Sequence, residues 1–201
     1  PDADPDAAVL AAMAKGKERR GYTRDEQGRI VPLCDSASLW LQMGLSDDKK
    51  KANTETYQHL VSQVLGFAPD SVREPILEPS ASDSAAAQAF VQGLGIASGK
   101  PLIGINTGAG GRWLYKQWTK EHQQTFLKLC DEAGLAVLLL GGPEEVQRHK
   151  DLLAFASGTP VYDGGNHNSY GRFAALIDQC SVVVTSDSLA VHVTAARKKP
   201  A

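Results

Sequence analysis

The strongest constraint on the fold is an alternation of apolar runs and helical patterns that begins near residue 84 and continues to the end of the chain. Apolar runs of about five residues, such as PLIGIN, LAVLLL and SVVV, alternate with segments of about ten or more residues that have helical periodicity. Such an alternation is typical of βαβ units, in which helices cover both faces of a parallel sheet. Residues 81–201 are therefore predicted to form a Rossmann-like, doubly wound α/β domain.

Residues 1–80 differ in composition, being polar and without a regular apolar period. Pro69, Pro75 and Pro79 interrupt any helical or strand periodicity there. One helix is predicted in DKKKANTETYQHLVSQVLGF (48–67), ending at Gly66. Its apolar stripe comprises Tyr57, Leu60, Val61, Val64 and Leu65. The first half of the chain offers few partners for this stripe, so we expect it to be exposed. We interpret residues 1–80 as a partial N-terminal segment and linker.

Composition excludes several classes of protein. The net charge is −2 with 22% charged residues, which gives no basic face for nucleic acid or an anionic membrane. Three widely spaced cysteines, Cys34, Cys130 and Cys180, argue against a zinc site and a disulfide framework and fit a reducing cytoplasm. There is neither an apolar run of about 18 residues nor a signal segment. The chain begins with Pro1 rather than Met, so we expect a processed or cut product.

Three strand-to-helix loops contain residues suited to ligand binding. In a parallel sheet these loops meet at one edge, where ligands bind. The first, TGAGGRWLYKQW (107–118), joins small residues at 108–111 to the cations Arg112 and Lys116. Glycines allow close backbone approach and cations attract an anion, so the loop suits phosphate. It matches neither G-x-G-x-x-G nor a P-loop, and an exposed loop with solvated cations is the alternative.

The second loop, GGPEE (141–145), places Glu144 and Glu145 in the first turn of a helix begun by Pro143. Carboxylates there are favoured by the helix dipole, so capping alone would explain them. The functional alternative is an acidic residue that accepts hydrogen bonds from ribose hydroxyls.

The third loop, TSDSLAVH (185–192), carries Ser186, Asp187 and Ser188, any of which can cap the last helix. His192 lies one turn beyond Ser188 on the same helix face. A lone histidine on a helix usually has a core or surface role, which is the alternative here. Two hydroxyls, a histidine and a helix N-terminus would face the same crevice as Lys116. Together these groups predict a pyrophosphate pocket.

The segments GINTGAGGRWLYKQW, LLLGGPEE and SYGRFAALIDQCSVVVTSDSLAVHVTAARKKP resemble the donor-binding half of glycosyltransferase family 9, the ADP-heptose:lipopolysaccharide heptosyltransferases. The resemblance runs from about residue 100 to the end, and RGYTRDEQGRIVPL with TYQHLVSQVLG is similar to the preceding segment of some members. It implies a GT-B architecture of two Rossmann-like domains, with the sugar nucleotide held mainly by the C-terminal one.

Carried over residue by residue, the resemblance assigns donor binding to Thr107, Gly108, Lys116, Glu145, Asp187, Ser188 and His192. Lys116 matches a lysine that contacts donor phosphate, and Glu145, rather than Glu144, matches the acid on the ribose. Asp187, Ser188 and His192 match the motif at the pyrophosphate. Trp118 matches a tryptophan with a packing role.

Three departures from the family pattern are visible. Leu189 stands where many members have glycine, and the catalytic aspartate of the N-terminal domain has no match before residue 80. The chain also lacks the strand and Phe-Gly-Pro-Thr type loop that follow in the family. We therefore interpret the sequence as an excised portion of a longer enzyme, truncated at its C-terminal end.

The implied activity is inverting transfer of a heptose, or a related sugar, from an ADP-sugar to a lipopolysaccharide core acceptor. No Asp-x-Asp cluster lies in the donor loops, so neither a metal nor a separate cofactor is expected. The expected partners are the nucleotide-sugar donor and a lipid-linked saccharide at the inner membrane surface, with no nucleic acid, and the expected location is the cytoplasm.

Three alternatives remain open at this level. An epimerase or oxidoreductase on the same sheet would bind NAD. A non-catalytic nucleotide-binding module would bind nucleotide without turnover, and an α/β domain whose loops only cap helices would bind no nucleotide.

Overall fold

The computed structural model describes residues 4–68, 71, 73–110 and 114–201, and it divides the chain into two compact units, Pro1–Arg73 and Glu74–Ala201. The second unit contains a parallel sheet of four strands: β3 (Leu102–Asn106), β4 (Ala136–Leu140), β5 (Val161–Asp163) and β6 (Val182–Val184). The strand order is β5-β4-β3-β6. The chain therefore winds outward from β3 in both directions, and the switch point lies between β3 and β6.

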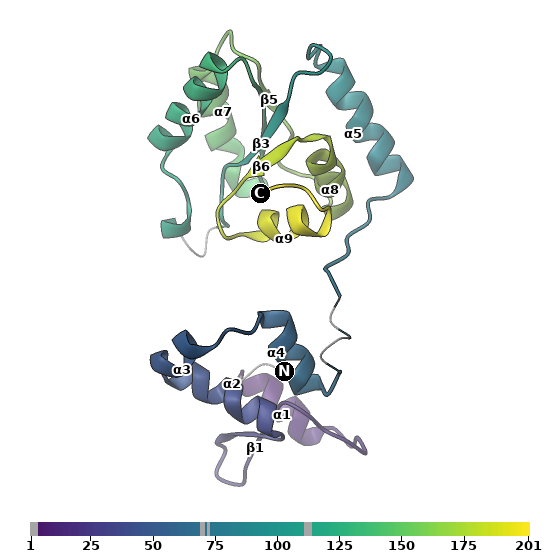
Figure 1. Cartoon of the computed structure of the whole chain (residues 1–201), viewed down its shortest axis with the longest axis vertical. Coiled ribbons are helices and arrows are strands. Elements are labelled where there is room, and N and C mark those ends of the chain that lie inside the picture. Colours follow the sequence, from purple (N-terminus) through teal and green to yellow (C-terminus); the bar gives the residue numbers. More distant parts are fainter. Residues whose placement is uncertain (1–3, 69–70, 72, 111–113) are drawn as a thin grey trace. The chain divides into compact units, whose positions relative to one another are not determined.

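Helices cover both faces of this sheet, as Figure 1 shows. On one face lie α5 (Ala81–Gly93), α8 (Tyr170–Gln179) and α9 (Leu189–Ala196), and on the other α6 (Lys120–Glu132) and α7 (Val146–Phe155). Strand β4 is buried throughout, with Leu138 and Leu140 in the first core and Val137 and Leu139 in the second. The predicted doubly wound α/β fold is confirmed.

Two short 3₁₀ helices lie in the loops that follow β3 and β4. The first, η2, spans Leu114–Lys116, and the second, η3, spans Pro143–Glu145 and precedes α7. The sequence predicted a single helix from Pro143 onward. The first turn is tighter because the Glu145 amide donates to the Gly142 carbonyl at 3.0 Å, three residues back, which closes a 3₁₀ turn.

The first unit is more regular than the sequence predicted. It contains α1 (Pro5–Met13), a hairpin of β1 (Tyr22–Arg24) and β2 (Ile30–Pro32), and the helices α2 (Asp35–Leu45), α3 (Asp47–Ala52) and α4 (Tyr57–Leu65). The expectation of one helix in an irregular segment is therefore wrong. These elements are short, and tertiary packing rather than local periodicity stabilises them.

The helix predicted across residues 48–67 is divided into α3 and α4. Between them, the Asn53 side chain accepts a hydrogen bond from the Glu55 amide at 3.2 Å, a local turn that competes with helix. Thr56 then caps α4, and Gly66 ends it in the left-handed conformation at φ 78°, as predicted.

The apolar stripe of α4 finds a partner within its own unit. Val64 is 1% exposed and packs with Tyr22 of the hairpin and Ala37 of α2. Tyr57 at the start of α4 is exposed, and its ring meets Trp40 edge-on at 5.1 Å between centroids. The expectation of an exposed stripe is wrong because Val64 is buried in a core formed with the hairpin and α2, neither of which the sequence revealed.

Within the described ranges, no helix has the length and hydropathy needed to cross a bilayer.

Candidate functional site

A cleft of about 850 Å³ lies at the carboxyl end of the sheet. Residues following β3, β4 and β5, and the start of α9, line it: Asn106, Gly108–Gly110, Gly141–Glu145, Asn166–Tyr170, Phe173 and Ser188–Ala190. The volume is in the range of about 300–1,000 Å³ that is usual for small-molecule sites. Its position at the switch point is where open α/β sheets bind ligands.

Two of the predicted site residues, Gly108 and Glu145, meet in this cleft. Glu145 is only 7% exposed, and its Oε2 accepts a hydrogen bond from the Gly142 amide at 2.8 Å. A Cβ on Gly108 would lie 1.9 Å from Glu145 Oε1, so a larger residue there would displace this carboxylate from its present position. Glu145 therefore caps η3 and also lines the cleft, and its role at a ribose stays a prediction.

Ser188 joins the same cleft from the other side of the switch point. Its Oγ accepts from the Ala190 amide at 3.3 Å and caps α9, whose positive end is directed to the cleft. Asn106, the last residue of β3, donates from Nδ2 to Ser188 Oγ at 3.2 Å and to the Gly108 carbonyl at 2.7 Å. Asn106 thereby ties together the turns that follow β3 and β6.

Lys116, Asp187 and His192 form an exposed charged group beside Ser188. Lys116 Nζ lies 2.6 Å from Asp187 Oδ2. The hydrogen bond from Lys116 holds the pKa of the Asp187 carboxyl below its usual value, and the charges of Lys116 and His192 lower it further. Within the described ranges, these three residues are not part of the lining of the large cleft but adjoin it at the start of α9.

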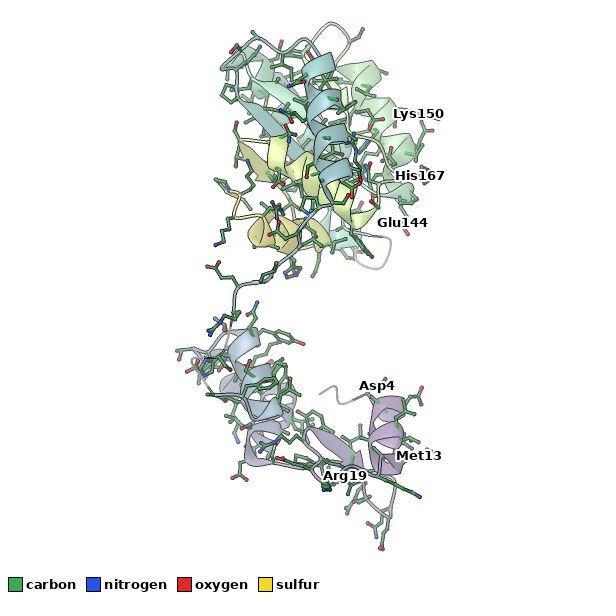
Figure 2. The ribbon with its side chains drawn as sticks, turned by 90° about the vertical axis from the view of Figure 1, so that its right-hand side faces the viewer. Asp4, Met13, Arg19, Glu144, Lys150 and His167 are labelled. Carbon is green, nitrogen blue, oxygen red and sulfur yellow. The ribbon has the colours of Figure 1, made fainter. Side chains whose placement is uncertain are left out.

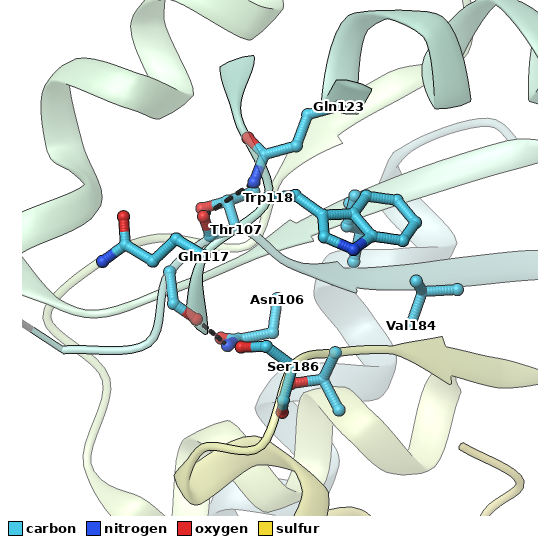
Figure 3. Close-up of a pocket in the computed structure, with 10 residues that line it drawn as sticks. Asn106, Thr107, Gln117, Trp118, Gln123, Val184 and Ser186 are labelled. Carbon is cyan, nitrogen blue, oxygen red and sulfur yellow. Dashed lines mark hydrogen bonds between the residues drawn. The ribbon is translucent and has the colours of Figure 1, made fainter. Parts of the chain in front are cut away.

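Thr107 points away from the cleft, into the protein. It is 1% exposed, its carbonyl accepts from Gln123 Nε2 at 2.8 Å, and its Oγ1 lies 3.0 Å from His149 Nε2. Thr107 lines a cavity of about 10 Å³, the size of about one water molecule. Trp118 and Ser186 line the same cavity, and Figure 3 shows the three residues together. Trp118 packs edge-on against Phe126, with centroids 5.9 Å apart, in agreement with a packing role.

Of the small and cationic residues that remain in the first loop, two line the cleft and two are not described by the structure. Ala109 and Gly110 line the cleft, whereas Gly111 and Arg112 lie outside the described residues. The phosphate-binding role predicted for Arg112 stays a prediction.

Sequence reasoning missed Asn106 and the polar run Asn166–Asn168, which follows β5. The same rule that selected the other three loops could have found this run, because β5 ends at the same edge of the sheet. Asn166 is 8% exposed and donates from Nδ2 to the Gly142 carbonyl at 3.1 Å. Figure 2 shows His167 and Glu144 on the same side of the unit, and both line the cleft.

Buried His149 was also missed, although helical spacing marks it, since it lies three residues after Val146 and three before Leu152, which is also buried. It lies in QRHKD, a polar stretch typical of an exposed helix face.

The described residues contain no group of three or more His, Cys, Asp or Glu side chains that could hold a metal ion. The groups that line the cleft are backbone amides, carboxamides, hydroxyls, the carboxylates of Glu144 and Glu145 and the imidazole of His167, with Lys116 and His192 nearby.

Comparisons with solved structures identify the same fold. A glycosyltransferase family 9 structure from Veillonella parvula matches with a TM-score of 0.62 and 22% identity, over 73% of this chain and 43% of that one. E. coli ADP-heptose lps heptosyltransferase II matches with a TM-score of 0.56 and 24% identity, over 66% of this chain and 40% of that one. The chain thus spans less than half the length of the structures it resembles.

A search of curated protein sequences finds no match. The family model described as glycosyltransferase family 9 (heptosyltransferase), however, matches residues 5–201, which include both units and every described residue of the cleft. A match of this extent, on a sheet whose switch point carries the cleft, shows that the chain belongs to glycosyltransferase family 9.

Proposed function

We propose that this chain binds the donor for a glycosyltransferase that transfers a heptose, or a related sugar, from an ADP-sugar to a lipopolysaccharide core acceptor. The observation that carries the proposal is the cleft at the switch point, where two glycine turns, Glu145 and the start of α9 converge. Glycine turns and a helix N-terminus suit a diphosphate, and a fixed carboxylate suits ribose hydroxyls.

In this proposal the donor lies along the cleft with its diphosphate at Ser188 and its ribose at Glu145. The nucleoside end extends toward Asn166–Asn168, whose amides and imidazole offer donors and acceptors to a base. Lys116 supplies a cation to the diphosphate. For this, its ammonium group must either leave Asp187 or contact Asp187 and the diphosphate at the same time.

The transfer is proposed to be inverting. An acceptor hydroxyl attacks the anomeric carbon while the bond from that carbon to the diphosphate oxygen breaks, and the electron pair leaves with the diphosphate. The proton of the hydroxyl passes to a general base, for which the family resemblance implies an aspartate that has no match before residue 80. Lys116, the positive end of α9 and protonated His192 stabilise the charge that develops on the leaving group, which removes the need for a divalent metal. The acceptor is proposed to be a lipid-linked saccharide at the cytoplasmic face of the inner membrane.

The first test is calorimetric titration of the chain with ADP, UDP and NAD. We expect selective binding of ADP, weakened roughly tenfold in Lys116→Ala and His192→Ala, since each removes one charge from the phosphate end. Lys120→Ala is the matched control, because Lys120 also forms an exposed ion pair, with Asp151 at 3.3 Å. Absence of ADP binding, or preference for NAD, would contradict the proposal.

Turnover separates the enzyme from a nucleotide-binding module. ADP-heptose is incubated with a lipopolysaccharide core acceptor, and release of ADP is followed. Release of ADP would exclude the non-catalytic alternative, whereas binding of ADP without release is expected both of that alternative and of a chain that lacks the catalytic aspartate.

A further inference from the structure

The imidazole of His149 lies buried beneath the floor of the cleft. His149 is on α7 and is 0% exposed, whereas its neighbour Lys150 is exposed, as Figure 2 shows. A buried imidazole is costly unless its nitrogens have partners. Here Nδ1 lies 2.8 Å from Asp163 Oδ1, and Nε2 lies 3.0 Å from Thr107 Oγ1 and 3.4 Å from the Leu140 carbonyl.

These three partners stand at the ends of three different strands. Asp163 ends β5, Leu140 ends β4, and Thr107 directly follows β3. A single side chain from a helix therefore holds together the ends of β3, β4 and β5.

Each of these strand ends continues into a turn that lines the cleft. Thr107 precedes Gly108, and Leu140 precedes Gly141, where an added Cβ would lie 2.9 Å from His149 Nε2. Asp163 Oδ1 also accepts from the Gly165 amide at 2.9 Å, next to the polar run that begins at residue 166. The ring is therefore packed directly under the cleft without being part of its lining.

A hydroxyl next to an imidazole that in turn contacts a carboxylate is also the arrangement found in enzymes with an activated nucleophile. Thr107 cannot act in that way, because it is 1% exposed and its amide and carbonyl are held by Leu140 at 2.9 Å and Gln123 at 2.8 Å. No substrate can reach its hydroxyl without disruption of the sheet edge.

We propose that His149 is a positioning residue for the donor cleft. It sets the spacing between the glycine turns at the diphosphate and the segment Gly164–Asn168 at the nucleoside. The inference rests on the proposed function, since it assigns ADP as the ligand of the cleft. Removal of the ring frees three turns at once. A displacement of about 1 Å in a positioning element can lower the activity of a site by on the order of a hundredfold.

Three substitutions separate the contributions of the two hydrogen-bonded nitrogens of His149. His149→Ala removes both contacts. His149→Asn places an amide near Nδ1 and keeps the contact with Asp163, whereas His149→Gln places one near Nε2 and keeps the contact with Thr107. Lys150→Ala, on the exposed side of the same helix, is the matched control.

The experiment measures the Kd for ADP by calorimetry and the Tm of each variant, using the whole chain well below the lowest Tm. We expect Kd to rise roughly tenfold to a hundredfold in His149→Ala, with partial recovery in the Asn or Gln variant and no change in the control. A lower Tm in His149→Ala with an unchanged Kd would overturn the proposal, because the role of His149 would then be structural alone.

A second measurement needs no ligand and separates this inference from the proposed function. Hydrogen exchange is followed at the amides of Thr107, Gly142 and Gly165, each of which donates to a partner at 2.8–2.9 Å. These amides are expected to exchange at least about tenfold faster in His149→Ala, while those inside β4 keep their protection.

If the parent chain fails to bind ADP, the proposed function fails, and the exchange rates alone decide the role of His149. Unchanged rates at all three amides would overturn it. If His149→Ala does not fold, Thr107→Val removes the partner of Nε2 and Asp163→Ala removes the partner of Nδ1, and both variants are measured in the same way. In Asp163→Ala the exchange is judged at the amides of Thr107 and Gly142 alone, because this variant also removes the acceptor of the Gly165 amide.

Discussion

At the level of single residues, the site contains backbone positions so close to neighbouring groups that only glycine fits without a shift of the neighbour. Gly108 is the clearest case, since it rests on the carboxylate of Glu145. That carboxylate in turn accepts the amide of Gly142 from the neighbouring turn. The glycine pattern of the first loop thus reflects internal packing as well as access for a ligand.

Gly108→Ala is predicted to displace the Glu145 side chain, because the added Cβ would lie 1.9 Å from Oε1. Loss of the hydrogen bond to Gly142 should lower the free energy of unfolding by about 1–3 kcal/mol. ADP affinity should fall roughly tenfold, since the carboxylate no longer faces the cleft. Urea unfolding and calorimetry measure the two effects.

Gly93→Ala is the control for this substitution, because a Cβ at Gly93 meets nothing within 4 Å. It should leave both quantities unchanged or add slightly to stability. An ADP affinity in Gly108→Ala equal to that of the parent would exclude Glu145 from donor binding.

At the level of elements, the start of α9 combines a structural and a binding role. Ser188 caps the helix and also lines the cleft, and it receives Asn106 from β3. Ser80 caps α5 in the same way, accepting from the Asp83 amide at 3.1 Å, but does not line the cleft. The two serines therefore allow capping and binding to be measured separately.

Ser188→Ala and Ser80→Ala are each predicted to lower the free energy of unfolding by about 1 kcal/mol through loss of an N-cap. Only Ser188→Ala should weaken ADP binding, because only that cap lies at the cleft. Equal ADP affinities in the two variants would show that the start of α9 does not contact the ligand. Thermal unfolding and calorimetry on matched samples provide the comparison.

At the level of the whole molecule, the segment before α5 belongs with the sheet unit. Arg197 donates from Nη1 to the Leu77 carbonyl at 2.9 Å and pairs with Glu78 at 2.9 Å, while its Nε pairs with Asp178. Leu77 also packs against the core beneath α8. These contacts place residues from Glu74 onward in the second unit, seven residues before the position that composition suggested.

A fragment of residues 74–201 is predicted to fold and to bind ADP like the whole chain, because every described residue that lines the cleft lies between 106 and 190. A fragment of residues 81–201 should be less stable by about 1–3 kcal/mol, since it loses Leu77 and the partners of Arg197. Urea unfolding of both fragments is the test. Equal stabilities would show that residues 74–80 serve only as a connection.

The sequence alone determined the α/β fold and the edge of the sheet at which the site lies. Short apolar runs such as LAVLLL that alternate with helical patterns are typical of strands in a sheet covered on both faces, and this alternation is a local pattern. The end of α4 at Gly66 and the cap of α9 within Ser186–Ser188 are local for the same reason.

Only the tertiary structure decided which polar residues face the cleft and which are buried beneath it. Thr107 and Gly108 are adjacent in sequence, yet one hydroxyl points inward to His149 while the other residue meets Glu145. His149 lies among polar neighbours, and its burial depends on strand ends that are 9 to 42 residues away in the chain. Helical spacing from Leu152 can place His149 on the inner face of α7, but the partners of its two nitrogens depend on packing between distant segments, about which hydrophobic periodicity holds no information.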